Sequence, residues 1–334
     1  MIDGFGDTNV LVQREVALPT PGYGEVLIGV RACGVCRLDL LERKGLMRGL
    51  VTPRILGHEI AGVVEAVGPG VSGFRPGDRI ATTQRRSVCG ICAFCRAGNE
   101  TLCARKLFFG HDCDGGYAER VVCSEGTAAA IPQGIPFEEA AIAACAIGTE
   151  LNAVRDTGRT QLGETVLVTG ASGGVGIHGV QLARAAGAHT IALTTSSAKV
   201  KRLREYGADE VVVAQDGRFA EQVRALTGGA GVDVAIDNVG TRAFHEVRKS
   251  LAPRGRWIMT GELGAERAEL NLAQIFLHGL SMLSVVSTSR VQLADSLRLI
   301  AQGVVRPVIG LRVPLSEVAD AHRRIERGDV FGRA

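Results

Sequence analysis

The stretch Thr165-Val-Leu-Val-Thr-Gly-Ala-Ser-Gly-Gly-Val-Gly176 decides the fold. A short apolar run leads into a glycine-rich turn, which opens a segment with helical periodicity from Val175 to Ala186. Strand, glycine turn and helix in this order are typical of a nucleotide site, because the turn approaches a pyrophosphate closely and the helix start offers free N–H groups. Ala171 replaces the first glycine of the usual pattern. The residues expected to contact the cofactor are Ser172, Gly173, Gly174, Val175 and Gly176.

The residues around this turn repeat the same alternation of strands and helices. Short β-branched runs alternate with helical stretches from Thr149 to Val286. Such alternation predicts a doubly wound parallel sheet with helices on both faces, which makes a purely structural glycine turn the weaker alternative. The predicted strands are 165–169, 190–194, 211–214, 232–236 and 257–260, with a further one near 281–286.

The end of the second predicted strand indicates which dinucleotide binds. An acidic residue there would bind the ribose diol of NAD, and none is present. Instead the hydroxyls of Thr195 and Ser196 precede Lys199, Lys201 and Arg202, and such hydroxyls and cations would suit a 2′-phosphate. The alternative is that Lys199 and the cations after it form a solvated helix face. We therefore expect NADP(H) in preference to NAD(H).

The two ends of the chain have a different texture. Residues 1–148 are rich in glycine, cysteine and β-branched residues, with strands predicted at 26–30 and 60–68, so a mostly β domain is expected. We expect residues 149–286 to form the cofactor domain. Residues 287–334 carry a helix (291–302), a strand (308–313) and a helix (315–326), and are expected to return to the first domain.

Composition excludes several classes of protein. The 334 residues suggest two domains, and 46% hydrophobic with 22% charged residues is ordinary for a globular protein. A net charge of +3 without long basic runs argues against nucleic acid or an anionic membrane as a partner. The chain has no apolar run long enough for a transmembrane helix, and residues 1–7 do not resemble a signal peptide. We expect a cytoplasmic protein.

Four of the nine cysteines form a compact motif. Cys89, Cys92, Cys95 and Cys103 follow the spacing C-x2-C-x2-C-x7-C, within a lobe of about residues 85–110. Four thiolates so close in sequence can complete a tetrahedral structural zinc site. An iron–sulfur cluster is the competing interpretation, because ferredoxins use similar runs. Nothing else in the chain resembles a ferredoxin, so zinc is preferred.

A second set of metal-binding residue types is dispersed. It comprises Cys36 in the run Cys33-Gly-Val-Cys-Arg-Leu-Asp39, His58 and Glu59 after a glycine, and Cys145 in an alanine-rich helix. The spacing of these residues alone is weak evidence for a shared metal site. A Gly-His-Glu is more often a surface turn, and a single cysteine among alanines is more often a packed thiol.

Taken together, these motifs resemble the zinc-containing medium-chain dehydrogenase/reductases, the alcohol dehydrogenase family. The similarity covers nearly the whole chain and adds Gly77-Asp-Arg79 and Asp114-Gly-Gly-Tyr-Ala-Glu119. It implies a GroES-like catalytic domain beside the Rossmann domain. It also implies a catalytic zinc on Cys36, His58 and Cys145, with Glu59, water or substrate in the fourth position. Asp39 would orient a ligand, and Val239 would contact the cofactor.

The remaining cysteines match no ligand position of that family. They are Cys33, Cys113 and Cys123, which we interpret as packing thiols.

The resemblance implies hydride transfer between nicotinamide and a small alcohol or carbonyl compound on a Lewis-acidic zinc. One residue departs from this pattern. Leu38 stands where alcohol dehydrogenases place the serine or threonine of a proton relay. The Gly-Gly-Val-Gly-Ile-His178 helix start looks more like the quinone and acryloyl-CoA reductase branches, which reduce an activated C=C bond. We expect His178 itself to have a local partner and no catalytic role. A non-catalytic nucleotide-binding protein is the remaining alternative.

The resemblance also implies a homodimer or a dimer of dimers. The cofactor sheet would continue across two subunits through the strand near Ser281 to Val286, since unpaired sheet edges invite such pairing.

Overall fold

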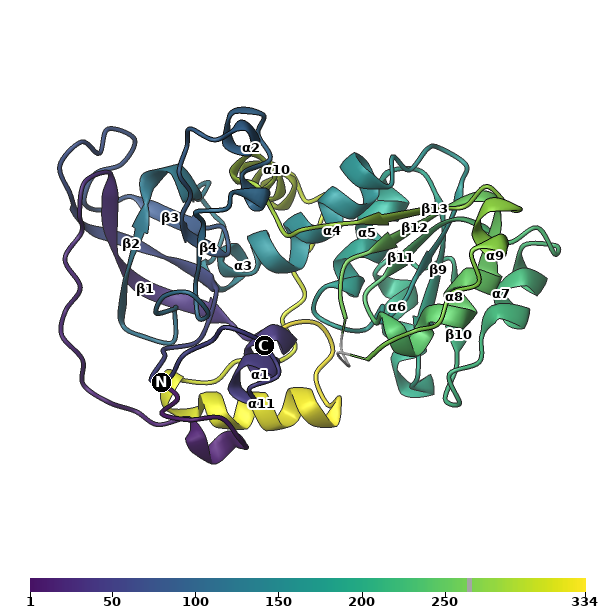
Figure 1. Ribbon diagram of the computed structural model, residues 1–334, viewed down its shortest axis with the longest axis horizontal. Helices are drawn as coiled ribbons and strands as arrows, with labels where there is room; N and C mark the ends of the chain where they lie inside the picture. Colours follow the sequence, from purple (N-terminus) through teal and green to yellow (C-terminus); the bar gives the residue numbers. More distant parts are fainter. Residues whose placement is uncertain (263–265) are drawn as a thin grey trace. The chain divides into compact units, whose positions relative to one another are not determined.

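The computed structural model describes residues 1–262 and 266–334. The chain forms two compact units, and each can be followed in Figure 1. The first unit consists of Met1–Gly148, Ser287–Gly303 and Ile309–Ala334, and the second of Thr149–Val286 and Val304–Val308. Across the described residues, no helix combines the length and the apolar character needed to cross a membrane.

The first unit is built on an antiparallel five-stranded sheet in the order β6-β1-β2-β3-β7. The predicted strands 26–30 and 60–68 are confirmed as parts of β1 and β2. Their inward side chains include Val26, Ile28 and Ile60, which are fully buried in one apolar cluster. The strands are β1 (Glu25–Gly34), β2 (Glu59–Val67), β3 (Arg79–Thr82), β6 (Arg120–Ser124) and β7 (Ala128–Ala130).

Short helices and a two-stranded ribbon complete the first unit. They are η1 (Thr8–Val10), α1 (Arg37–Arg43), β4 (Arg85–Ser87), α2 (Ala93–Arg96), η2 (Glu100–Leu102), β5 (Leu107–Phe108), η3 (Glu125–Thr127), α3 (Phe137–Ala141), η4 (Ala143–Gly148), α10 (Arg290–Ala301), η8 (Leu315–Glu317) and α11 (Val318–Arg327). The predicted helices at 291–302 and 315–326 are confirmed.

The predicted strand at 308–313 is wrong. Only an isolated bridge joins Ile309 to Arg333 in this segment. Pro307 and Pro314 bracket the apolar run, and neither has the N–H that a ladder requires, so the pairing does not extend.

The second unit contains a parallel six-stranded sheet in the order β10-β9-β8-β11-β12-β13, with helices on both faces (Figure 1). The chain runs outward from β8 to β10 and returns to start again at β11, so the strand order reverses between β8 and β11. The strands are β8 (Thr165–Val168), β9 (His189–Thr194), β10 (Glu210–Val213), β11 (Val232–Asp237), β12 (Leu251–Met259) and β13 (Ser281–Ser284). The predicted α/β fold is confirmed.

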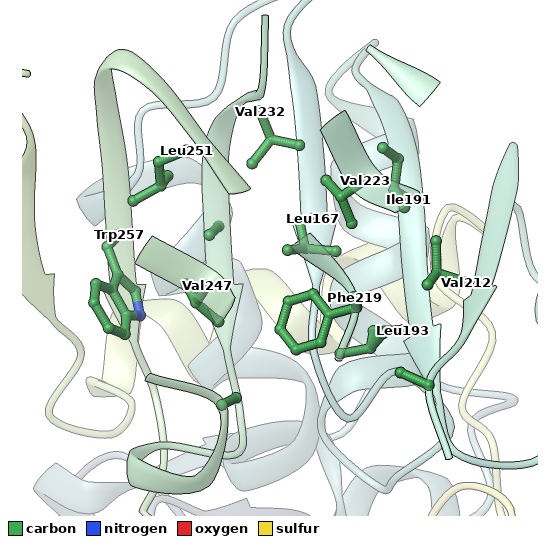
Figure 2. Close-up of a cluster of buried hydrophobic side chains, with 13 residues drawn as sticks. Leu167, Ile191, Leu193, Val212, Phe219, Val223, Val232, Val247, Leu251 and Trp257 are labelled. Atoms are coloured by element: carbon green, nitrogen blue, oxygen red, sulfur yellow. The ribbon is translucent and has the colours of Figure 1, made fainter. Parts of the chain in front are cut away.

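The sheet of the second unit is covered by an apolar core. Figure 2 shows Leu167, Val232 and Trp257 from three strands meeting Phe219 and Val247 from the covering segments. Strands buried on both faces are near-continuous apolar runs, which is why they could be recognised in the sequence. The helices are α4 (Thr149–Leu151), η5 (Asn152–Thr157), α5 (Gly176–Ala185), η6 (Ser197–Lys199), α6 (Val200–Glu205), α7 (Ala220–Leu226), η7 (Thr241–Ala243), α8 (Phe244–Ser250) and α9 (Ala273–Phe276).

Helix α5 also holds the return segment 304–308. His178 contacts the carbonyl of Gly174 through Nδ1 at 2.9 Å and accepts the backbone N–H of Val308 at Nε2, at 3.1 Å. Gln181 binds the backbone of Arg306 in both directions. His178 therefore has the local partners expected from the sequence.

Candidate functional site

The first unit brings the dispersed set of donors together. Cys36 caps α1, His58 directly precedes β2, Glu59 begins that strand, and Cys145 lies in the π-helical turn η4. One donor atom from each of the four residues lies within 4.8 Å of those of the others. We call these four residues the dispersed cluster. Turns of π-helix are frequent at functional sites.

The spacing of the two sulfur atoms fits a shared metal ion. Cys36 Sγ and Cys145 Sγ are 3.9 Å apart, although the residues are 109 positions apart in the chain. A disulfide would hold two sulfurs at about 2.05 Å. Two thiolates bound to a tetrahedral zinc at about 2.3 Å each are about 3.8 Å apart.

His58 and Glu59 carry buried atoms that lack a hydrogen-bond partner. Asp39 Oδ1 lies 3.0 Å from His58 Nδ1, whereas His58 Nε2 and both Glu59 oxygens form no hydrogen bond with the described residues. His58 Nε2 is 4.0 Å from Glu59 Oε1. Buried polar atoms are normally satisfied, so their grouping here fits a cation between them.

Local sequence explains why these side chains converge. The carboxylate of Asp39 accepts the backbone N–H of Cys36 at 2.7 Å, which starts α1 and fixes the cysteine at its N-cap. Gly34 leaves the space that the Glu59 carboxylate fills, and Gly57 has a positive φ of 94° and faces the ring of Tyr117. A side chain at Gly34 would displace Glu59, and one at Gly57 would clash with Tyr117.

Arg333 supplies a positive charge that the sequence did not predict. Its Nη2 lies 2.7 Å from Glu59 Oε1, an ion pair without hydrogen-bond geometry, and 3.4 Å from Cys145 Sγ. Burial raises the pKa of Glu59 to about 7, and the Arg333 guanidinium reduces that shift. The hydrogen bond from Cys145, aided by Arg333, lowers the pKa of the Cys36 thiol. The positive charge therefore favours thiolate at this position.

The four cysteines of the lobe also converge, and they do so locally. Their sulfur atoms lie within 4.8 Å of one another, and Cys89 Sγ is 3.9 Å from Cys95 Sγ, again the spacing of two zinc ligands. Each of Cys92 and Cys95 donates its backbone N–H, at 3.4 Å, to the sulfur of the preceding cysteine in the motif. The N–H groups of Ile91 and Cys92 lower the pKa of Cys89 to about 5. These N–H groups therefore favour the thiolate at Cys89, whereas burial raises the pKa of Cys95 to about 12.

The other cysteines behave as packing groups. Cys113 and Cys123 are buried in the apolar cluster of the five-stranded sheet, and Cys33 packs against it. A cavity of about 510 Å³ is lined by Cys33 and Tyr117, but by no member of the dispersed cluster. The donor set, and not this cavity, defines the site.

In the second unit, the glycine turn lies where the sequence predicts. It joins β8 to α5, and a Cβ on Gly176 would lie 2.6 Å from the carbonyl oxygen of Gly170, so only glycine lets the helix start so close to the turn. The side chain of Val239, which follows β11, lies beside Gly170. Both segments therefore meet where the strand order reverses, the usual ligand position in such sheets.

The residues predicted to bind a 2′-phosphate follow the end of β9. β9 ends at Thr194, whose hydroxyl accepts the backbone N–H of Ser196 at 3.3 Å. Thr195 is exposed, and Ser196 and Lys199 are half-buried. The next carboxylate in the chain is that of Glu205, at the end of α6.

Comparisons with known proteins agree with this geometry. Residues 22–133 match the model of the alcohol dehydrogenase GroES-like domain, and residues 174–302 match that of the zinc-binding dehydrogenases. The acryloyl-coenzyme A reductase of Sulfurisphaera tokodaii is 35% identical over 321 residues, which cover 96% of this chain and 94% of that protein. The chain belongs to the zinc-containing alcohol dehydrogenase family.

Solved structures of this family have the same fold. The crystal structure of AibC is 45% identical, with a TM-score of 0.93, and the match covers 99% of this chain and 93% of that one. An NAD-dependent alcohol dehydrogenase is 36% identical, with a TM-score of 0.92 and coverage of 99% and 97%. Membership of the family makes the chain an NAD(P)-dependent oxidoreductase, and both the resemblance and the GroES-like plus Rossmann fold are confirmed.

The positions that sequence reasoning missed are those with no local signature. Arg333 follows an apolar segment near the end of the chain, far in sequence from the carboxylate it pairs with. The one available signal was general: an arginine in a segment that becomes buried needs an acidic partner. Nothing in its neighbours identified Glu59 as that partner.

Proposed function

We propose that this family member is a zinc-dependent NADP(H) oxidoreductase that transfers a hydride between nicotinamide and a small alcohol or carbonyl compound. The observation that carries the proposal is the dispersed cluster. Among the described residues, two sulfur atoms at 3.9 Å, an imidazole nitrogen without a hydrogen-bond partner and a carboxylate paired only with Arg333 share one position. Three protein ligands with one exchangeable position are what a catalytic zinc requires.

Each side chain has a separate task in this proposal. Cys36, His58 and Cys145 would hold the ion, and Glu59 would occupy the fourth position until substrate takes it. When bound, zinc supplies Lewis acidity to the substrate oxygen, and nicotinamide supplies or accepts the hydride. Arg333, whose Nη2 lies 2.7 Å from Glu59 Oε1, would keep that carboxylate paired when substrate takes the fourth position.

The lobe cysteines would hold a second, structural zinc. Four thiolates leave no position for a substrate, so this ion would serve stability alone. The short elements of the lobe bury little apolar surface, since none of the residues of α2 is buried. A metal would therefore replace the missing core.

NADP(H) is the cofactor that the end of β9 supports. The residues that would bind a 2′-phosphate are Thr195, Ser196 and Lys199, and no carboxylate is present there to bind a free ribose diol. The glycine turn from Ser172 to Gly176 would bind the pyrophosphate at the start of α5. Val239 would contact the cofactor from the end of β11.

Reduction of an activated C=C bond is the second candidate. Leu38 cannot pass a proton from an alcohol, which favours a reaction that does not need this relay. The similarity to a protein named acryloyl-coenzyme A reductase points the same way. In that reaction the hydride would go to the β-carbon, and the developing enolate oxygen would need a donor or cation.

A substrate panel with one pair of variants separates these functions. Purified protein is given NADPH with aldehydes, ketones, enones and enoyl-CoA thioesters, and the comparison is made between Cys36→Ser and Cys33→Ser. Both variants change one thiol of the same segment, but only Cys36 belongs to the dispersed cluster. Carbonyl turnover that is lost in Cys36→Ser and kept in Cys33→Ser supports the first function. Alkene reduction that survives Cys36→Ser supports the second. Tight NADPH binding without any turnover would contradict both.

A homodimer through β13 is the assembly that the second unit supports. β13 is the edge strand of the six-stranded sheet, and the segment before it exposes about 70% of Leu272, Phe276 and Leu277. Large exposed apolar side chains beside an open strand edge are typical of an interface. Analytical ultracentrifugation should find a dimer, or a dimer of dimers, for the wild type and a smaller species for Phe276→Glu. A wild-type monomer would contradict this assembly.

A further inference from the structure

Asp39 receives three hydrogen bonds. Its Oδ2 accepts from the backbone N–H of Cys36 at 2.7 Å and from the hydroxyl of Tyr117 at 3.0 Å, and its Oδ1 lies 3.0 Å from His58 Nδ1. Asp39 is fully buried. The carboxylate therefore ties two members of the dispersed cluster to a tyrosine that lies outside it.

The hydrogen-bonded chain continues beyond Tyr117. Tyr117 Oη is 3.3 Å from His322 Nε2, and His322 Nδ1 is 3.5 Å from Arg43 Nη1. Arg43 Nη2 pairs with Glu326 at 2.6 Å, and Glu326 is the first member with substantial exposure, at 29% of its side chain. Tyr117, His322 and Arg43 are buried. A continuous polar path thus runs from the dispersed cluster to the surface of the first unit.

The direction of each hydrogen bond in this path can be derived. Arg43 can only donate, so His322 Nδ1 must accept. Burial lowers the pKa of His322 to about 4, which leaves the ring neutral near pH 7. A neutral imidazole that accepts at Nδ1 carries its proton on Nε2, so it donates to Tyr117 Oη. Burial, followed by the charge of Asp39, raises the pKa of Tyr117, which keeps its hydroxyl proton to donate to Asp39.

From Arg43 inward, each hydrogen bond of the path therefore points toward Asp39, which must accept. An accepting Asp39 places a proton on His58 Nδ1. When His58 is neutral, as metal binding requires, the lone pair therefore lies on Nε2, the atom that has no hydrogen-bond partner among the described residues. Reversing one hydrogen bond along the path would leave a donor facing a donor. The path thus selects one tautomer and one orientation of His58.

We propose that Tyr117 and His322 are positioning residues for the dispersed metal site: they orient Asp39, and through it His58, without touching the ion. This inference deepens the proposed function and rests on its metal site. It assigns a task to two side chains that lie outside the motifs of metal ligands. Groups behind a ligand commonly change metal affinity by about 10-fold to 100-fold.

A purely structural role makes a different prediction, so the variants must separate the two. Tyr117→Phe keeps the ring that packs against Gly57 and removes only the hydroxyl. His322→Leu removes both hydrogen bonds, whereas His322→Gln can still accept from Arg43 through its oxygen and donate to Tyr117 through its amide. Tyr23→Phe is the matched control, because Tyr23 is 84% exposed and belongs to the same unit.

The measurement is the release of zinc from the holoprotein to a chromogenic chelator, together with the visible absorption spectrum after cobalt replaces zinc at the dispersed site. Tyr117→Phe and His322→Leu should release the zinc of the dispersed cluster about 10-fold faster and alter the cobalt spectrum. Release from the four-cysteine lobe, an internal reference, should stay unchanged. His322→Gln should recover most of the wild-type rate, and Tyr23→Phe should match the wild type.

Two outcomes would overturn the inference, and they can be told apart. If the wild type holds both zinc ions, but Tyr117→Phe and His322→Leu change only the melting temperature, the residues are structural and the proposed function survives. If the wild type holds only the lobe zinc, the metal site fails and the inference fails with it.

Discussion

The lobe and the dispersed cluster each bring four possible metal donors together, but they are assembled in opposite ways. The lobe gathers four thiols within 14 positions of sequence and stabilises them by backbone N–H groups of the same loop. The dispersed cluster gathers donors up to 109 positions apart, and its charges are balanced by Asp39 and Arg333. A site built from local turns serves the stability of one loop, whereas a site built from distant segments can place different chemistry around one open position.

The largest effect that would test this contrast is expected at Cys145. Cys145→Ala removes one ligand of the dispersed cluster, and a Lewis acid contributes several kcal/mol to charge stabilisation. Carbonyl turnover should fall by about 1,000-fold, equivalent to about 4 kcal/mol. The melting temperature should change by only a few degrees, because the lobe is untouched. Steady-state kinetics beside calorimetry measure both, and turnover within tenfold of the wild type would contradict the contrast.

At Cys92 we expect the opposite result, a loss of stability with little change in activity. Cys92→Ser should destabilise the protein by about 4 kcal/mol, a fraction of what zinc contributes to small zinc-dependent folds. The melting temperature would then fall by roughly 10 °C. The kcat/KM of the protein that remains folded should stay close to the wild type. A large loss of kcat/KM at full stability would mean that the lobe takes part in the chemistry.

Two buried carboxylates sharpen the contrast further. Glu59 has Arg333 beside it, whereas Glu150 in the second unit is fully buried and neither of its oxygens has a hydrogen-bond partner in the part of the chain that the structure describes. Burial raises the pKa of Glu150 from 4.5 to about 7, and Asn238 only partly opposes the shift. The folded protein therefore holds this proton more tightly than the unfolded chain does. The resulting stability is complete below about pH 4.5 and is lost as the pH rises through about 7.

Glu150→Gln removes the contribution of Glu150 to the pH dependence of the free energy of unfolding. The variant should be more stable than the wild type above pH 7, by as much as about 3 kcal/mol, and the difference should shrink toward pH 5. Thermal unfolding of the metal-loaded proteins from pH 5 to pH 8.5 measures it. Equal differences at both ends of the range would show that Glu150 does not titrate in this way.

The smallest effect is expected at the residues proposed to bind a 2′-phosphate. Lys199→Met should weaken NADPH binding by about 10-fold, the value of one charge-assisted hydrogen bond, and leave NADH affinity unchanged. Fluorescence titration with both cofactors gives the ratio, with Lys249→Met, in α8 of the same unit, as the control. A wild-type preference for NADH would contradict the assignment of NADP(H).

The contrast also explains how much could be predicted from the sequence. The strands of the second unit were recognisable because they are buried apolar runs, and the lobe was recognisable because its four cysteines share one loop. The dispersed cluster could be placed only through the resemblance, because Cys36, His58 and Cys145 have no local feature that requires them to meet. Periodicity failed at 308–313, where Pro307 and Pro314 prevent an apolar run from forming a ladder.

The contacts around the dispersed cluster lay beyond sequence reasoning for the same reason. Arg333 and His322 come from segments that follow the cofactor domain, and they reach the cluster only through the folded first unit. Their roles follow from burial and from the direction of hydrogen bonds, neither of which has a sequence pattern.

The zinc content of the purified protein tests the central claim most directly. Elemental analysis by plasma mass spectrometry should find two zinc ions per chain in the wild type, and one each in Cys36→Ser and Cys92→Ser. A single zinc in the wild type that persists in Cys36→Ser would show that the dispersed donors do not hold a metal, and would contradict the account.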